Sequence, residues 1–155
     1  MSISIKQANL DSVLPIRLSV FCDEQGYDPA QEVDEYDNGH DHPIVHFAAY
    51  VQQETPINQD KEAAVGTCRL VLFPEKNIAK LGRVAVLSSH RNQRIASKLL
   101  NEAHEYCRNQ PEIKYVQADC QVAVVPFYST LGYKEIGDIV YDQGQPHQGM
   151  VKKLD

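Results

Sequence analysis

A strand, a basic turn and a helix follow one another in residues 81–100, LGRVAVLSSHRNQRIASKLL, and this unit limits the folds open to the chain. The apolar run of residues 84–87 is typical of a buried strand. From Ile95 onward, apolar residues at three- and four-residue spacing predict a helix with one buried face. The turn between them is basic and has no acidic residue. Because the first N–H groups of a helix lack intrahelical partners and the helix dipole is positive there, the unit predicts an anion site.

The rest of the chain supplies further strands and two more helices. Strands are expected over residues 3–8, 43–53, 62–73, 78–87, 115–120, 133–140 and 149–154, with helices over residues 10–24, 95–109 and 125–131. The polar residues 54–61 are expected to form a hairpin loop. This order predicts an α+β (mixed α/β) fold in which helices cover both faces of a central sheet, within one domain of residues 1–155.

Composition narrows the function classes. The formal net charge of −6 argues against a general nucleic-acid-binding role and gives no reason to expect a membrane surface. The first ten residues, MSISIKQANL, lack the basic and apolar regions of a signal peptide, so a soluble, cytoplasmic protein is expected, with the nucleus left open. The four cysteines have no C-x-x-C spacing, so free thiols are expected and no metal site is predicted.

Residues 27–42, YDPAQEVDEYDNGHDH, are dense in carboxylates and turn formers and have no lasting apolar period. Loops this long inside a compact domain are uncommon unless they have a function. One interpretation is a substrate lid in which Glu32 and Asp34, together with Glu24 and Asp37, form an electronegative pocket for a cationic amine such as a polyamine or amino sugar. The other is a solvated acidic loop.

Two motifs resemble signatures of the GCN5-related N-acetyltransferase (GNAT) superfamily. Residues 91–96, RNQRIA, are similar to its (Gln/Arg)-x-x-Gly-x-(Gly/Ala) pyrophosphate loop, with Arg94 at the place of the middle glycine. Residues 127–133, FYSTLGY, are similar to its Phe-Tyr-x-x-x-Gly-(Phe/Tyr) motif. Further segments resemble the ElaA/YjcF-like branch: Arg17 to Gln25, Glu32 to Asp37, Gly66 to Leu70, Gly82 to Val86 and Gly144 to Met150.

The resemblance implies a mostly antiparallel, twisted sheet of six or seven strands. It also implies an acetyl-CoA-dependent N-acetyltransferase that passes the acetyl group directly to a primary amine, which we expect to belong to a small molecule, without a metal. The residues implied to contact acetyl-CoA are Val84, Ala85, Val86, Arg91, Asn92, Gln93, Arg94, Ile95, Ala96, Phe127 and Tyr128. Phe127 is also expected to pack in the core.

Tyr128 is the expected general acid in this resemblance. A phenol has an unperturbed pKa of about 10, above the value of about 8.5 for a thiol, so it can protonate a departing thiolate. A purely structural tyrosine is the alternative. The general base is less defined: Glu24 is the first candidate, and His46, Asp119, Gln121 and His147 are others. In histone-type members a glutamate occupies the position that is Lys80 here.

The acceptor contacts are expected from Glu24, Glu32, Asp34, Gln121 and His147. Two other functions stay open at this point. One is acetylation of protein lysines or N-termini, which would need a long open groove. The other is a non-catalytic acyl-CoA sensor. The absence of the histone-type glutamate at Lys80 and the presence of Arg94 at the glycine position of the motif would fit that function. A homodimer is left open as well, and no residue pattern names the physiological acceptor.

Overall fold

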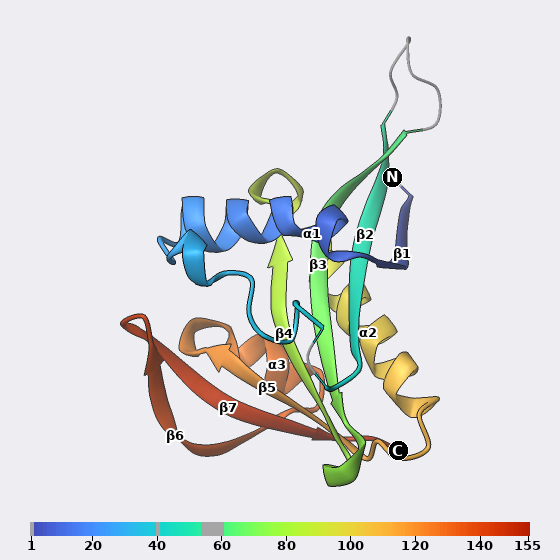
Figure 1. Cartoon of the computed structure of the whole chain (residues 1–155), viewed down its shortest axis with the longest axis vertical. Coiled ribbons are helices and arrows are strands. Elements are labelled where there is room, and N and C mark those ends of the chain that lie inside the picture. The colour runs from blue at the N-terminus through green and yellow to red at the C-terminus, as the bar shows by residue number, and fades with distance from the viewer. Residues whose placement is uncertain (1, 40, 54–60) are drawn as a thin grey trace.

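The computed structural model describes residues 2–39, 41–53 and 61–155. Within these residues, seven strands form one sheet in the order β1-β2-β3-β4-β5-β7-β6 (Figure 1). The strands are β1 (Ile3–Ala8), β2 (Ile44–Gln53), β3 (Lys61–Phe73), β4 (Ile78–Val86), β5 (Tyr115–Gln121), β6 (Lys134–Asp142) and β7 (Gln145–Lys153). Neighbouring strands are antiparallel except β4 and β5, which run parallel. The predicted α+β fold with a mostly antiparallel sheet is therefore confirmed.

Helices cover both faces of this sheet. The helix α1 (Leu10–Arg17) continues as a π-helical turn (Leu18–Glu24), and α2 (Ile95–Arg108) and α3 (Val125–Thr130) follow later in the chain. Short 3-10 turns lie at Pro29–Gln31, Pro74–Lys76, Ser88–His90 and Val122–Val124. Ala85 on β4 packs against α1, whereas the neighbouring strand residue Cys68 on β3 contacts α2. Because successive strand residues point to opposite faces, α1 and α2 lie on opposite sides of the sheet.

The main core lies between the sheet and α2. One stripe of that helix is fully buried and supplies Ile95, Leu99, Leu100, Ala103 and Cys107. These positions recur every three or four residues, which is the spacing predicted for its buried face. They pack with strand residues such as Leu70 and Leu81, and Tyr128 of α3 belongs to the same cluster. The position of α2, and of the turn that precedes it, therefore follows from ordinary apolar packing.

The parallel strands β4 and β5 separate partway along their length. Their pairing joins residues 78–81 to residues 115–118 and goes no further. A register shift between Thr67 and Arg69 of β3, with Arg83 of β4 at a φ of 50°, marks a bulge where β4 bends. Figure 1 shows the two arrows diverging from a common lower end. Beyond the split, residues 82–86 of β4 have no strand partner on the β5 side within the described chain.

The structure departs from the sequence prediction mainly in the first helix and in the last two strands. The first helix does reach Glu24, but its last turns are π-helical, with Gln25 N–H bonding to the carbonyl of Val20. The strand expected to begin at residue 149 begins at Gln145, and β6 runs on to Asp142. The reason is a two-residue hairpin turn in which Gln143 and Gly144 both have positive φ, so the strands pair up to the turn itself. The predicted hairpin loop at residues 54–61 lies almost wholly outside the described residues.

Candidate functional site

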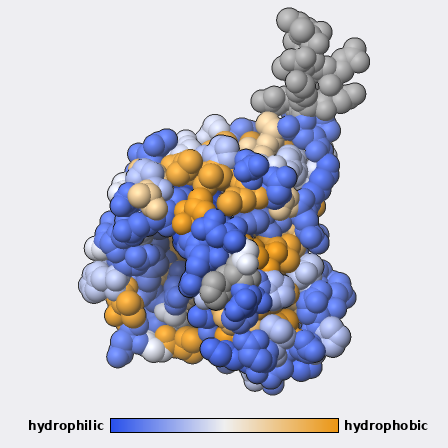
Figure 2. Space-filling view, viewed as in Figure 1, coloured by the Kyte–Doolittle hydropathy of each residue, from blue (hydrophilic) through white to orange (hydrophobic). Residues whose placement is uncertain are grey.

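A cavity of about 940 Å³ occupies the wedge between β4 and β5 on the α1 side of the sheet. Strands β3 to β7 form its walls, and the segment that follows α1 contributes Gln25, Tyr27, Gln31, Glu32 and Tyr36 to its rim. Figure 2 shows this side of the molecule, where hydrophilic residues predominate below α1 and apolar residues gather over α1 itself. The cavity is thus open to polar ligands rather than sealed in the core.

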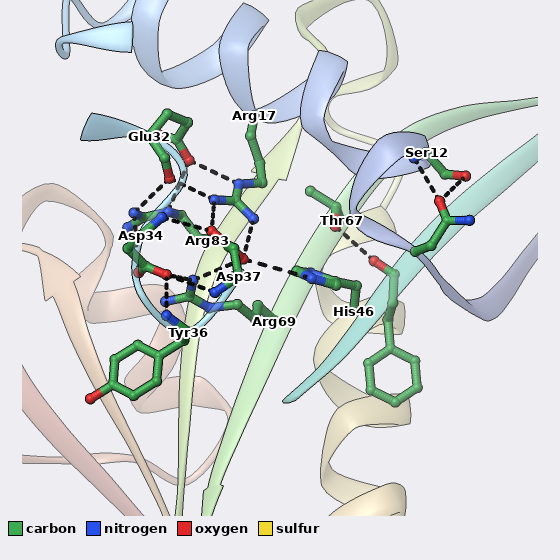
Figure 3. Close-up of polar contacts among 12 residues, drawn as sticks. Ser12, Arg17, Glu32, Asp34, Tyr36, Asp37, His46, Thr67, Arg69 and Arg83 are labelled. Carbon is green, nitrogen blue, oxygen red and sulfur yellow. Dashed lines mark hydrogen bonds and ion pairs between the residues drawn. The ribbon is translucent and has the colours of Figure 1, made fainter. Parts of the chain in front are cut away.

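A cluster of three arginines and three carboxylates borders this cavity (Figure 3). We call it the ion-pair cluster, and its members are Arg17, Glu32, Asp34, Asp37, Arg69 and Arg83, with His46 at its edge. Its residues come from α1, β3, β4 and the segment 32–37, so it joins elements that are far apart in the chain. Three positive and three negative side chains leave the cluster with no formal net charge.

Arg17 is the centre of the cluster and is fully buried. Its Nε lies 2.9 Å from Oε2 of Glu32, and its Nη2 donates to the Glu32 carbonyl oxygen over 2.7 Å. The same guanidinium donates to both carboxylate oxygens of Asp37, at 3.1 and 2.7 Å. Arg69 donates to Asp34 and Asp37, and Arg83 lies 2.9 Å from Glu32. This network holds the segment 32–37 against the strands.

Burial and pairing set the protonation states in the cluster. Burial alone would raise the pKa of Asp37, but the hydrogen bonds from Arg17 and its charge hold that pKa well below the usual range. Burial lowers the pKa of His46, and the nearby Asp37 carboxylate opposes this effect only partly. His46 is therefore neutral near pH 7. It does not line the cavity, so the structure does not bring this base candidate to the site.

The ion pairs of the cluster correct the prediction of an electronegative pocket. Glu32 lines the cavity and Asp34 does not, arginines neutralise both, and the Asp37 side chain is fully buried. Asp28, Glu35 and Asp41 of the same segment are exposed. The charges of Glu32, Asp34 and Asp37 anchor the segment to the sheet and are not free for a ligand. The argument for a cationic acceptor, which rested on these carboxylates, loses its basis.

Glu24 is also engaged elsewhere. Its carboxylate forms a bidentate ion pair with Arg91, in which Nη2 donates to Oε1 over 2.7 Å. Arg91 donates from Nε to the Val86 carbonyl oxygen over 3.1 Å, so the pair ties the end of the first helix to the end of β4. The hydrogen bond from Arg91 lowers the pKa of Glu24. Glu24 does not line the cavity, and a paired carboxylate with a lowered pKa is a poor base, so its predicted catalytic and acceptor roles are not supported.

The turn before α2 has the shape of an anion site. Asn92 and Arg94 have φ values of 64° and 61°, the left-handed region that suits glycine. Arg94 therefore adopts at this position the conformation that a glycine reaches without strain. No side chain caps α2, and its first internal bond runs from Lys98 N–H to the Arg94 carbonyl. The N–H groups of Ile95, Ala96 and Ser97 precede that bond and remain available to a ligand.

Tyr128 lies at the inner wall of the cavity on α3. Its side chain is buried, and its ring makes edge contacts with Phe127 and Tyr133 at centroid distances of 5.6 and 5.3 Å. Burial, followed by the nearby Cys120 thiol, raises the pKa of Tyr128 well above its ordinary value. The phenol is thus protonated at neutral pH and borders the cavity. Phe127 is partly buried against the core, in line with its expected packing role.

Three of the base candidates lie together on β5 and β7. Asp119, Gln121 and His147 all line the cavity, and Gln121 pairs directly with His147 across the two strands. The Gln121 amide donates to the Gln25 side chain over 2.7 Å, so we assign Gln121 a positioning role. His147 Nδ1 lies 2.9 Å from the Gln145 carbonyl oxygen. Because that oxygen can only accept, Nδ1 is the donor in this contact, and Nε2 is the ring nitrogen that can accept a proton.

Comparison with known proteins decides the family. The model of the acetyltransferase (GNAT) domain matches residues 45–154. The chain belongs to the GNAT acetyltransferase family. A provisionally named acetyltransferase of Bacillus subtilis (strain 168) is 28% identical over 149 residues, which cover 96% of this chain and 92% of the relative. Protein ElaA of Escherichia coli (strain K12) is 26% identical over 74 residues, 48% of each chain.

Solved structures show the same fold. The crystal structure of Escherichia coli ElaA superposes with a TM-score of 0.80 at 22% identity and covers 97% of this chain and 99% of that one. An aminoglycoside 6'-N-acetyltransferase complexed with coenzyme A gives a TM-score of 0.68 at 20% identity, covering 100% and 98%. Both the GNAT assignment and its ElaA-like character, predicted from the two motifs and the branch segments, are confirmed.

Within this GNAT domain, sequence reasoning missed the ion-pair cluster. Arg17, Arg69 and Arg83 each stood in a branch-like segment, but nothing in those segments showed that they meet one set of carboxylates. The usable signal was the presence of three arginines in largely apolar elements and four carboxylates in residues 32–37, three of which join the cluster. No group of three or more His, Cys, Asp or Glu side chains in the described part of the chain can hold a metal ion. Likewise, no described helix is both long and apolar enough to cross a membrane.

Proposed function

We propose that this GNAT protein is an acetyl-CoA-dependent N-acetyltransferase that acts on the primary amine of a small molecule. The observation that carries the proposal is the split between β4 and β5, which leaves one edge of residues 82–86 without a strand partner among the described residues, next to a cavity that reaches Tyr128. An unpaired strand edge offers N–H and C=O groups to an extended amide chain such as pantetheine. The structural neighbour that was solved with coenzyme A shares this fold, which supports the same ligand here.

The residues present fit acetyl-CoA on two further counts. The uncapped start of α2 offers N–H groups of Ile95 and Ala96 to the pyrophosphate, and Arg94 adds a charge beside them. Arg91 is paired with Glu24 and bonded to the end of β4, so we assign it to shaping the loop more than to free charge. With the pyrophosphate at this turn, the pantetheine would follow residues 84–86 toward the cavity, and the thioester would come to rest near Tyr128.

Direct transfer then needs one base and one acid. The neutral amine attacks the thioester carbonyl carbon, so a C–N bond forms and the C–S bond breaks. In our proposal His147 Nε2 takes the proton from the amine, assisted by the nearby carboxylate of Asp119, and the Tyr128 phenol protonates the departing thiolate. The tyrosine then regains a proton from solvent, and the histidine releases to solvent the proton that it took from the amine. The buried cysteines have raised pKa values and sit in the core, so no covalent relay is invoked.

Access to the cavity favours a small acceptor over a protein chain. The segment that supplies Gln25, Tyr27 and Gln31 is tied to the far strands by two contacts. Gln121 bonds to Gln25, and Asp28 N–H donates to the Gln143 side chain over 3.0 Å. These contacts bridge the two sides of the wedge. A long open groove, which a protein substrate would require, is thereby interrupted.

The test is turnover with a panel of small amines and a lysine peptide. Purified protein is mixed with acetyl-CoA and each acceptor, free thiol is followed with time, and products are checked by mass for one added acetyl group. Release of CoA that depends on a small amine supports the proposal, and intersecting initial-rate lines would support a ternary complex. Tight acetyl-CoA binding without turnover on any amine would instead favour an acyl-CoA sensor, and turnover on the peptide alone would favour a protein acetyltransferase.

A further inference from the structure

The cavity has two walls of opposite charge, and this bears on the acceptor. Its positive residues are Arg69, Lys80 and Arg83, from β3 and β4. Its negative residues on the other side are Asp119, Asp138 and Asp142, from β5 and β6. Glu32, on the rim, is already paired with Arg17 and Arg83. A ligand that enters the wedge therefore meets cations on one side and carboxylates on the other.

Lys80 is the cation that remains available on the positive wall. Arg69 and Arg83 are neutralised by the three carboxylates of the ion-pair cluster. The Lys80 ammonium has no ion-pair partner within the part of the chain described, and it rests over the Phe73 ring at 5.5 Å from the centroid. Its side chain is exposed toward the cavity. An unpaired cation held on an aromatic ring beside a polar cavity is suited to bind an anionic group of a ligand.

The strand register sets Lys80 at a short distance from the negative wall. Lys80 pairs with Gln117 of the parallel strand β5, and Asp119 lies two residues further on the same face. With about 4.8 Å between paired strands and about 3.3 Å per residue, the Lys80 and Asp119 Cα atoms would be roughly 8 Å apart, and the divergence of the strands beyond Ala118 lengthens this distance. Yet no ion pair joins them in the described structure. A small ligand can bridge the two side chains.

Lys80 is too far from the turn before α2 to serve the pyrophosphate. Six residues of β4 separate Lys80 from Val86, which at about 3.3 Å per residue is roughly 20 Å. The cation therefore belongs to the acceptor half of the cavity and not to the half that we assign to acetyl-CoA. A single ammonium also matches a singly charged carboxylate better than a doubly charged phosphate.

We propose that the acceptor is an amino carboxylate, whose carboxylate binds Lys80 while its amine is presented between Asp119 and His147. This inference rests on the proposed acetyltransfer and adds the class of its substrate. It replaces the cationic amine that the acidic segment suggested from the sequence. The position where histone-type relatives carry a glutamate would here hold the residue that selects the acceptor.

Matched acceptor pairs test the proposal. Each ω-amino carboxylate from β-alanine to 6-aminohexanoate is compared with its primary amide, which keeps the shape and the amine but loses the negative charge. The expected result is a kcat/KM about 10- to 100-fold higher for the carboxylate, the range of one charge-assisted contact. Lys80→Gln should reduce this ratio to about 1, and Lys80→Glu should favour the amide. The control Lys114→Gln alters an exposed lysine outside the cavity and should leave the ratio unchanged.

The outcomes separate the two proposals. Equal rates on carboxylates and amides, or an undiminished preference in well-folded Lys80 variants, would overturn the amino carboxylate and leave acetyltransfer standing. If no acceptor turns over, the proposed function fails, and the acceptor class is judged by calorimetric binding to the protein loaded with CoA. In that case, binding of the carboxylate that is lost in Lys80→Gln supports the inference, and absence of binding refutes it. Melting curves of each variant guard against misfolding.

Discussion

Replacing Arg17 by Met removes the centre of the ion-pair cluster while keeping much of its side-chain volume. Arg17 is fully buried, and the two carboxylates that it contacts, Glu32 and Asp37, are 5% and 0% exposed in their side chains. The substitution removes both hydrogen bonds that the Asp37 carboxylate receives from Arg17, and it removes one of the two arginine contacts of the Glu32 carboxylate. An uncompensated carboxylate in such a setting either stays ionised at a high cost or takes up a proton.

The expected loss in the free energy of unfolding depends on which arginine partners each carboxylate keeps. Breaking a buried pair by removing one partner costs about 3–5 kcal/mol. Asp37 retains Arg69 at 3.1 Å and Glu32 retains Arg83 at 2.9 Å, so the expected loss for Arg17→Met lies near the lower end, about 3 kcal/mol. For a chain of this length, 1 kcal/mol shifts the midpoint of thermal unfolding by about 2–4 °C, which predicts a fall of roughly 6–12 °C.

The dependence on pH gives this prediction a second readout. The folded-state pKa of Asp37 is depressed, so its ionised form stabilises the native protein above the unfolded-state pKa of about 3.9, and this stabilisation is lost as the pH falls. Without Arg17 the same carboxyl should have a higher folded-state pKa. The difference in stability between wild type and Arg17→Met should therefore be largest near pH 7 and should shrink below about pH 4.

Thermal melts and urea unfolding, both followed by circular dichroism at several pH values, measure the midpoint shift and the stability difference. The double variant Arg17→Met with Asp37→Asn should recover part of the loss at pH 7, because the buried charge left by the first change is gone. Arg17→Lys, which keeps the charge but not the bidentate geometry, should fall between wild type and Arg17→Met. A midpoint shift below about 2 °C, or a stability difference that does not change with pH, would refute the reasoning.

Three other substitutions test single positions. Tyr128→Phe should lower kcat by roughly 10²–10⁴-fold with little change in acetyl-CoA affinity, whereas full activity with a lower melting temperature would make the tyrosine structural. Arg94→Gly should be more stable to urea than Arg94→Ala by about 1 kcal/mol, because the site has a φ of 61°, and equal stabilities would argue against strain there. Gly149→Ala should destabilise the fold, since its Cβ would lie 2.9 Å from the Ile136 carbonyl oxygen, while Gly82→Ala meets no atom within 4 Å and serves as the control in melting experiments.

Local patterns in the sequence were sufficient for most elements. The buried stripe of α2 repeats every three or four residues, and the strand before it ends in an apolar run at residues 84–86, so both could be predicted from local patterns. The π-helical turn could not, because Leu18–Glu24 has the same apolar spacing that an α-helix would have. The early start of β7 was hidden for another reason: Gln143 occupies a positive-φ position that glycine or asparagine usually marks.

The site was harder to predict because its decisive contacts join distant residues. Arg17 meets Glu32 and Asp37, fifteen and twenty positions away, and Arg69 meets Asp34 across thirty-five. The sequence alone does not show whether a given carboxylate is solvated, paired with a cation or free to bind a ligand. The motifs located the acetyl-CoA half of the site, since it depends on a local strand, turn and helix. They said little about the acceptor half, which is assembled from five strands.

The bulge in β4 connects these two halves. At Arg83 the backbone takes a φ of 50°, and its guanidinium reaches the Glu32 carbonyl oxygen over 3.0 Å. The same deviation turns β4 away from β5, which opens the wedge and frees the strand edge beyond it. One local distortion therefore both creates the edge proposed to bind pantetheine and anchors the segment that borders the acceptor. Lys80 lies before the bulge, where β4 and β5 are still paired, so the proposed carboxylate contact is set by the sheet itself. A rigid contact on the sheet, opposite a segment held by buried ion pairs, can select an acceptor by the spacing between its charge and its amine.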